Sequence, residues 1–113
     1  MNIGVIGQGY VGSAIKVGFD NYYKLSTYDK FDSNKSSCNS LADLVELSDI
    51  IFVCVPTPMN KKTGECYIGI VDEVCNEINN CAKDKIVVLK STVPPGATKD
   101  LSVKYKNINI IFN

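Results

Sequence analysis

The chain has 113 residues, a length at which one domain with its own hydrophobic core is expected. Hydrophobic residues make up 45% and charged residues 21%, which is the balance of a folded globular protein and argues against disorder. Lys plus Arg and Asp plus Glu each number 12, so the net charge is zero. Nucleic acid and membranes are therefore not expected as partners, because no basic field would attract them and no apolar run is long enough to span a bilayer.

The cysteine and histidine counts limit which disulfides, metal sites and catalytic groups the chain can contain. The five cysteines are an odd number, no pair has the spacing C-x-x-C, and the N-terminus does not resemble a signal peptide. This pattern favours reduced thiols in the cytoplasm over a disulfide framework, and it predicts no metal site. Histidine is absent, which excludes imidazole acid–base catalysis and the Ser-His and Cys-His nucleophile systems.

The first half of the chain alternates between strand and helix patterns. Ile3–Ile6 is a short apolar run that predicts a buried strand. A helical stripe runs from Tyr10 to about Asn21, and Lys24–Tyr28 predicts a second strand. The polar stretch Lys30–Asn39 is expected to be a loop, with room for a vestigial strand near Cys38.

The second half repeats the alternation. Ser40 and the residues after it predict a capped short helix that turns Leu41, Leu44 and Val45 inward. The remaining expected elements are the strand Ile50–Val55, the helix Gly69–Ala82, the strand Ile86–Leu89, a helix with Ala97, Leu101 and Tyr105 in register, and the strand Ile108–Phe112. This order predicts an α/β fold: a single doubly wound, mostly parallel sheet of Rossmann type that binds ligands at the carboxyl ends of its strands.

A glycine motif, Gly7-Gln8-Gly9-Tyr10-Val11-Gly12, follows the first strand directly and opens the first helix. G-x-G-x-x-G in this context is typical of dinucleotide binding. Gly7 would permit a tight turn, Gly9 would let a pyrophosphate approach the backbone, and Gly12 would let the helix pack against the strand. The helix N-terminus would then face the phosphates. The alternative is a tight strand–helix turn without a ligand.

Asp29 ends the second predicted strand, 22 residues after Gly7. A carboxylate at this distance can accept hydrogen bonds from the adenosine ribose, and it would repel a 2′-phosphate. NAD is therefore predicted over NADP, although Lys30 and Lys35 nearby weaken the preference. The alternative is a solvated aspartate at a strand end.

Three motifs in order resemble the N-terminal NAD-binding domain of the UDP-glucose/GDP-mannose dehydrogenase family. They are the glycine motif, Asp49-Ile50-Ile51-Phe52-Val53-Cys54-Val55-Pro56-Thr57-Pro58, and Lys90-Ser91-Thr92-Val93-Pro94-Pro95-Gly96-Ala97-Thr98. The resemblance covers nearly the whole chain, so residues 1–113 are expected to form one NAD-binding domain. The family oxidises a nucleotide sugar twice at C6 and reduces two NAD molecules.

The resemblance implies a role for particular residues. Tyr10 and Val11 would offer backbone groups to the pyrophosphate, and Asp29 would hold the ribose. Thr57 would line the nicotinamide side, and Thr92 would lie near the nicotinamide and the reacting carbon. Either threonine could instead be a turn residue that bonds to local backbone. A UDP-sugar would reach the site only with a partner domain or chain. A homodimer is expected, built either on the last strand, which would leave a bare edge, or on the helix faces that the absent domain would cover. The alternative is a monomer whose last strand packs against the helix that precedes it.

The departures from the family bear on catalysis. The stretch between the second strand and Asp49 is shorter than usual, and Lys35 lies only near the expected cofactor-binding lysine. The family's linker helix, its sugar-nucleotide domain and the glutamate that follows the position of Asn113 are not in this sequence. The expected function is therefore the cofactor half of a UDP-glucose 6-dehydrogenase-like oxidoreductase. A non-catalytic dinucleotide-binding module and the N-terminal domain of a β-hydroxyacid dehydrogenase remain alternatives, so whether the chain is itself an enzyme stays open.

Overall fold

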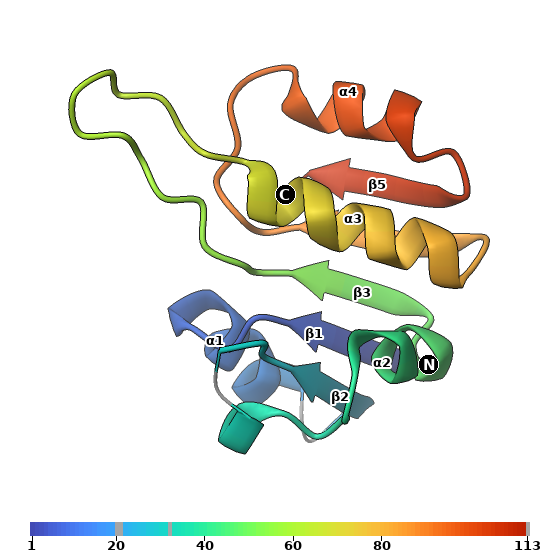
Figure 1. Cartoon of the computed structure of the whole chain (residues 1–113). Helices are drawn as coiled ribbons and strands as arrows, with labels where there is room; N and C mark the ends of the chain where they lie inside the picture. The colour runs from blue at the N-terminus through green and yellow to red at the C-terminus, as the bar shows by residue number, and fades with distance from the viewer. Residues whose placement is uncertain (20–21, 32, 113) are drawn as a thin grey trace.

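The computed structural model describes residues 1–19, 22–31 and 33–112. Within them, strands and helices alternate as the sequence predicts (Figure 1). The elements are β1 (Asn2–Ile6), α1 (Tyr10–Phe19), β2 (Lys24–Tyr28), a 3₁₀ turn η1 (Ser33–Lys35), α2 (Leu41–Leu47), β3 (Ile50–Val53), α3 (Gly69–Cys81), β4 (Lys85–Leu89), α4 (Ala97–Lys104) and β5 (Ile108–Phe112). In these ranges no helix has the length and apolar character needed to cross a membrane.

The strands form one parallel sheet in the order β2-β1-β3-β4-β5. The chain moves from β1 outward to β2 and then returns to place β3 on the other side of β1. The order of strands thus reverses between β1 and β3. In doubly wound folds the ligand crevice lies at this point, outside the carboxyl ends of the strands.

Helices α2, α3 and α4 cover one face of the sheet and enclose the main core (Figure 1). In β3 the alternate residues Ile51 and Val53 are fully buried, and in β4 the same holds for Val87 and Leu89. These strands supply the sheet side of the core, and the helices supply Leu44, Val45, Val71, Cys75, Ile78 and Leu101. Burial of this apolar surface is the main force that holds the three helices on the sheet.

The opposite face of the sheet carries α1, which packs over β1. Phe19 at the end of α1 contacts Phe52 on β3, with ring centroids 6.0 Å apart. Beyond this contact, Ile86 on β4 and Ile111 on β5 are 37% and 51% exposed. Among the described residues, this face is therefore covered over one half only.

The helix cap at Ser40 is confirmed. Its Oγ accepts a hydrogen bond from the backbone N–H of Asp43 at 3.2 Å, and the helix buries Leu41, Leu44 and Val45 as expected. Such a cap satisfies one of the backbone donors that a helix leaves without a partner in its first turn.

Two local predictions are wrong and one lies partly outside the described residues. β3 ends at Val53 rather than Val55, because Lys90 and Ser91 both donate to the carbonyl of Val53 as the strands separate. No strand forms near Cys38: the N–H groups of Ser37 and Cys38 share one acceptor, the Thr27 carbonyl, so no ladder can develop. The helix α1 ends at Phe19, and its predicted last residues, 20 and 21, lie outside the described residues.

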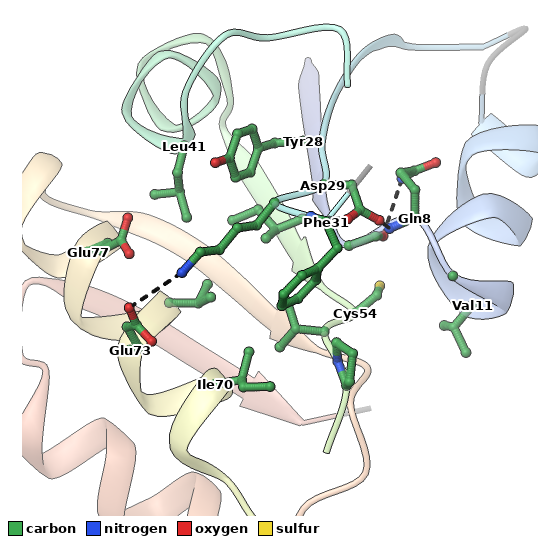
Figure 2. A pocket seen from close by; sticks show the side chains of 17 residues that line it. Gln8, Val11, Tyr28, Asp29, Phe31, Leu41, Cys54, Ile70, Glu73 and Glu77 are labelled. Carbon is green, nitrogen blue, oxygen red and sulfur yellow. Dashed lines mark hydrogen bonds and ion pairs between the residues drawn. The ribbon is translucent and has the colours of Figure 1, made fainter. Parts of the chain in front are cut away.

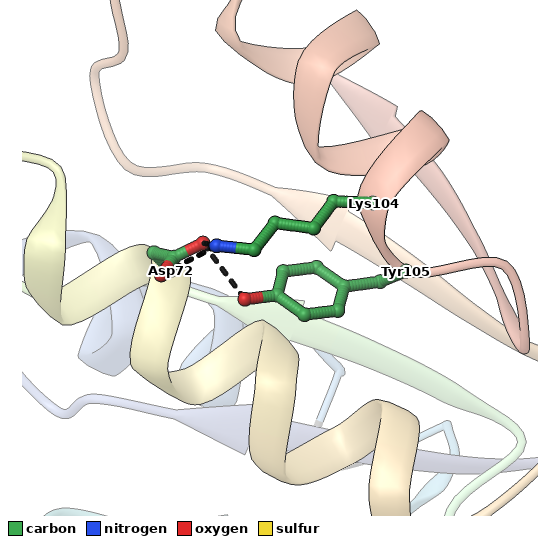
Figure 3. Close-up of polar contacts among 3 residues, drawn as sticks. All are labelled: Asp72, Lys104 and Tyr105. Atoms are coloured by element: carbon green, nitrogen blue, oxygen red, sulfur yellow. Dashed lines mark hydrogen bonds and ion pairs between the residues drawn. The ribbon is translucent and has the colours of Figure 1, made fainter.

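A polar cluster of Asp72, Lys104 and Tyr105 ties α3 to the end of α4 (Figure 3). The Tyr105 hydroxyl donates to Asp72 Oδ1 at 2.8 Å, and Lys104 Nζ donates to the same oxygen at 3.0 Å. Burial alone would raise the pKa of Asp72, but the hydrogen bonds from Tyr105 and Lys104 outweigh it and hold this pKa below its usual value. The cluster therefore stabilises the fold at neutral pH.

Tyr105→Phe is expected to lower the free energy of unfolding by about 1 kcal/mol at pH 7, because it removes one hydrogen bond to a carboxylate. The pKa of Asp72 is lowered on folding, so the contribution of its charged form is lost as the pH falls through the folded-state pKa. The cost of the substitution should accordingly shrink in acid. Urea unfolding at neutral and at acidic pH measures the cost of the substitution under each condition. Tyr22→Phe is the control, since Tyr22 is 79% exposed. An equal cost at both pH values would contradict this account.

Candidate functional site

The glycine motif forms a tight loop between β1 and α1, and each glycine has a different environment. Gly7 has φ of +92°, and a Cβ there would lie 2.6 Å from the Cys54 carbonyl oxygen. A Cβ on Gly12 would collide with the Gly7 carbonyl oxygen. A Cβ on Gly9 would meet nothing within 4 Å. Gly7 and Gly12 are thus required by the fold, whereas Gly9 faces the open space that a ligand could occupy.

The first turn of α1 lies beside this space and contains backbone donors without a partner in the described part of the chain. Tyr10 opens the helix, and its side chain lies outside what the structure describes. The N–H groups of Val11 and Gly12 have no acceptor among the described residues. Free N–H groups at a helix N-terminus, together with the helix dipole, favour an anionic group such as a pyrophosphate.

Asp29 lies beside the glycine loop and is held there by hydrogen bonds. Its Oδ2 accepts from the backbone N–H of Gln8 at 2.8 Å, and its Oδ1 accepts from that of Phe31 at 2.9 Å. Lys35 Nζ reaches the same loop and donates to the Gln8 carbonyl at 3.3 Å. The carboxylate is therefore fixed in the crevice, and each of its oxygens has a further lone pair for a ligand hydroxyl.

A pocket of about 520 Å³ extends from the glycine loop to α3 (Figure 2). Gly7, Gly9, Val11 and Asp29 line one end of it. The rest of its wall is mostly apolar: Tyr28, Phe31, Leu41, Val55, Pro56, Ile70 and Val74. A mostly apolar cleft of this size with a few polar groups at one end is the usual form of a small-molecule site.

Thr57 and Thr92 lie in a second pocket of about 710 Å³, beyond the loop that follows β3. Cys66 joins the two segments, because its thiol lies 3.6 Å from the carbonyl oxygens of Thr57 and of Thr92. Neither threonine hydroxyl has a hydrogen bond to the described part of the chain. Both hydroxyls are thus left without the local backbone bond expected of a simple turn residue.

Two of the thiols, those of Cys54 and Cys75, are in surroundings that disfavour the thiolate. Burial, only partly offset by Lys90, raises the pKa of Cys54 to about 11, and burial with the nearby Asp72 charge raises that of Cys75 to about 12. Such thiols are inert at neutral pH.

Six of the eight predicted residues line two pockets at the carboxyl ends of the strands, while Gly12 packs against the Gly7 carbonyl and the Tyr10 side chain is outside the described part of the structure. Gly7, Gly9, Val11 and Asp29 line the first pocket, whereas Thr57 and Thr92 line the second. Sequence reasoning missed the outer wall of the first pocket, which Phe31 and the α3 residues Ile70, Glu73, Val74 and Glu77 supply. Ile70 and Val74 belong to the apolar stripe of the predicted helix. Only the structure shows that the first turns of α3 line this pocket.

A parallel sheet with its crevice between β1 and β3, a glycine loop and a carboxylate at the end of β2 define a dinucleotide-binding Rossmann-type domain. The family model for the NAD-binding domain of the UDP-glucose/GDP-mannose dehydrogenase family matches residues 29–110. The chain belongs to this family, as its three motifs had indicated, and NAD is its cofactor.

Three individual relatives show the extent of the similarity. The UDP-glucose 6-dehydrogenase of Rickettsia conorii is 30% identical over 146 aligned positions, which cover the whole chain and 33% of that enzyme. The structure of a GDP-mannose dehydrogenase from Pseudomonas aeruginosa matches the whole chain and 36% of its own with a TM-score of 0.84 at 22% identity. A 3-hydroxyisobutyrate dehydrogenase from Mycobacterium tuberculosis shares the fold, with a TM-score of 0.79 at 11% identity over 98% of this chain and 39% of that one.

Two conclusions follow from these figures. The chain spans about one third of the length of these relatives. The alignment with the Rickettsia enzyme has 146 positions for a chain of 113 residues, so that enzyme carries insertions relative to this one.

Proposed function

We propose that residues 1–113 form the cofactor half of an enzyme that oxidises a nucleotide sugar at C6 with NAD. One observation carries the proposal: Gly9, Asp29 and the apolar pocket lie together at the carboxyl ends of β1 and β2. The open space at Gly9, the free N–H groups of α1 and the fixed carboxylate match the pyrophosphate and ribose of a dinucleotide in charge and hydrogen-bonding capacity.

In this proposal each group of the chain has one task. Gly7 and Gly12 shape the loop, while Gly9, Tyr10 and Val11 present backbone to the pyrophosphate. Asp29 accepts the ribose hydroxyls. Thr57 and Thr92 lie toward the nicotinamide and the sugar, and their unpaired hydroxyls orient the ring, with Thr92 next to the reacting carbon. The bound NAD would supply the hydride acceptor.

The chain would complete this reaction only together with a sugar-nucleotide domain, in the same polypeptide or in a partner chain. Burial raises the pKa of the Cys54 and Cys75 thiols, which makes them poor nucleophiles, and the chain contains no histidine. Correct positioning of the substrate contributes roughly 7–11 kcal/mol to catalysis, and a UDP-sugar has no second wall in the part of the chain that the structure describes. We place the protein in the cytoplasm, because all five cysteines are free thiols.

A chimera tests the proposal: this chain replaces the NAD-binding part of the Rickettsia UDP-glucose 6-dehydrogenase. NADH formation with UDP-glucose or GDP-mannose, lost in Thr92→Ala, would support it, and the same fusion with Asp29→Ala is the control for cofactor binding. NAD binding without turnover of any of these substrates would identify a non-catalytic module.

We also propose a homodimer that uses β5. This strand is one of the two edges of the sheet, and its residues Ile111 and Phe112 are 51% and 52% exposed. Exposed apolar strand edges pair readily with another chain, and most homo-oligomers have two-fold symmetry. The alternative is a monomer, in which α4 already covers the inner face of β5.

Ile111→Lys is therefore expected to shift the protein from dimer to monomer, because it places a charge in the interface. Light scattering coupled to size exclusion measures the change. Val17→Lys is a matched control, since Val17 is 76% exposed on α1, away from β5. A monomer at high protein concentration, unchanged by Ile111→Lys, would rule the interface out.

A further inference from the structure

The long loop between β3 and α3 folds back on itself and extends away from the sheet (Figure 1). The backbone N–H of Asn60 donates to the Glu65 carbonyl at 2.7 Å, and that of Tyr67 donates to the Pro58 carbonyl at 2.8 Å. Between these two bonds, residues 59 and 66 form an antiparallel bridge. Residues 58–67 are therefore an ordered hairpin, and Cys66 lies on its returning segment.

The tip of this hairpin is closed by local hydrogen bonds. Asn60 Oδ1 accepts from the backbone N–H groups of Lys62 at 2.9 Å and of Thr63 at 3.3 Å. The N–H of Gly64 donates to the Asn60 carbonyl at 2.8 Å, and its φ of +73° is one that glycine adopts without strain. The hairpin thus keeps its own shape, and its position relative to the sheet depends on contacts at its base.

Cys66 supplies such a contact. Its thiol donates to the carbonyl oxygen of Thr57, at the start of the loop, and to that of Thr92, which follows β4, with Sγ 3.6 Å from each oxygen. One thiol proton serves one acceptor at a time, so the hydrogen bond alternates between the two carbonyls. In the described part of the chain, no other hydrogen bond joins residues 58–67 to residues 90–96.

The two carbonyls belong to the residues whose hydroxyls have no partner in the second pocket. Thr57, Thr92 and Cys66 all line this pocket. Deeper in the structure, buried Ser91 already ties the two strand ends together, because its Oγ donates to the Val55 carbonyl at 2.8 Å. Thr92 lies one residue beyond that bond and is exposed, so its distance from Thr57 depends on the Cys66 contact.

We propose that Cys66 is a positioning residue for the second pocket: its thiol holds the hairpin against the end of β4 and so sets the spacing of the Thr57 and Thr92 hydroxyls. The thiol acts here as a hydrogen-bond donor and not as a nucleophile. The inference rests on the proposed function, in which these hydroxyls orient the nicotinamide and the reacting carbon. It adds the group that fixes their separation.

A thiol suits this position better than a hydroxyl. An O–H···O bond needs about 2.5–3.0 Å between its oxygens, whereas the thiol reaches both carbonyls across 3.6 Å. Cys66→Ser keeps a donor but places it on a shorter side chain, so it can bond to one carbonyl only if the hairpin moves. Cys66→Ala removes the donor altogether. The two variants should therefore show a graded loss.

Calorimetry with NAD and with AMP tests the effect on the pocket. Cys66→Ala is expected to raise the Kd of NAD about two- to fivefold, the size of a weak hydrogen bond, and to leave that of AMP unchanged, because AMP has no nicotinamide half. Cys66→Ser should lie between Cys66→Ala and the unaltered chain. Cys81→Ala is the matched control, because Cys81 is an exposed thiol at the end of α3 that lines neither pocket.

Hydrogen exchange tests the contact itself without a ligand. In Cys66→Ala the amides of Asn60 and Tyr67 should exchange faster, because the hairpin has lost its tie to the segment after β4. The amides of β3 and β4 should keep their protection. This pattern would distinguish a released hairpin from a general loss of the fold.

The outcomes separate this inference from the proposed function. If Cys66→Ala binds NAD as tightly as the unaltered chain, the thiol does not position the pocket and the inference is wrong, while the cofactor site stands. Equal losses for NAD and AMP, or unchanged exchange in the hairpin, would also overturn it. If the unaltered chain binds neither NAD nor AMP, the proposed function fails, and the positioning role fails with it.

Discussion

Gly12→Ala is expected to lower the free energy of unfolding by about 3 kcal/mol, whereas Gly9→Ala should leave it unchanged. A Cβ at Gly12 collides with the Gly7 carbonyl, which is backbone and cannot move without opening the contact between α1 and β1. At Gly9 a Cβ meets no neighbour, and the backbone there does not have positive φ. The two glycines of one motif thus serve different purposes.

Gly9→Ala should instead weaken NAD binding by about tenfold or more, because the added methyl group lies where the pyrophosphate approaches the backbone. Urea unfolding and calorimetry on both variants separate the two effects. A Gly9→Ala protein that is as stable as the original and binds NAD equally well would remove the pyrophosphate from this loop. A stable Gly12→Ala protein would show that α1 can shift without cost.

Asp29→Ala should weaken NAD binding by on the order of 1–3 kcal/mol, the range for losing hydrogen bonds to a charged group. The preference for NAD over NADP should fall at the same time, because the negative charge that repels a 2′-phosphate is gone. Part of the loss is indirect, since the N–H groups of Gln8 and Phe31 both lose their acceptor.

Asp29→Asn distinguishes the two contributions. The amide keeps the shape of the side chain and one acceptor oxygen, but it removes the charge. It should therefore abolish the discrimination against NADP while it retains more of the NAD affinity than Asp29→Ala does. Calorimetry measures the affinities for NAD and NADP of the unaltered chain, of Asp29→Ala and of Asp29→Asn. Equal affinity of the unaltered chain for NAD and NADP would contradict the assignment of Asp29.

Most of the sheet could be predicted from the sequence because its signals are local. The segments Lys24–Tyr28 and Ile108–Phe112 were predicted as strands, and the structure reproduces both bounds. Gly7, Gly9, Val11 and Asp29, which the sequence placed at the ends of two neighbouring strands, line one pocket. These patterns depend on neighbouring residues and on the regular geometry of a parallel sheet.

The outer wall of the site could not be predicted in this way. Phe31 and Ile70 are about 40 residues apart, and each has an ordinary local pattern, a loop and a helical stripe. Their approach depends on the angle of α3 and on the course of the loop after β2, which the packing of distant side chains decides. The separation of Thr57 and Thr92 into a second pocket likewise depends on the path of the long loop between β3 and α3.

The place of β1 between β2 and β3 also sets an order of events during synthesis. β1 is made first, yet one of its two edges stays unpaired until β3, beginning at Ile50, has been translated. β3, β4 and β5 pair in sequence order, so each finds its partner as soon as it is complete. Closing the loop from β1 to β3 carries the larger entropic cost, and we expect it to limit the folding rate. A nascent chain that ends before Ile50 would expose one edge of the apolar strand β1. We expect chaperone binding to matter most at this stage of synthesis.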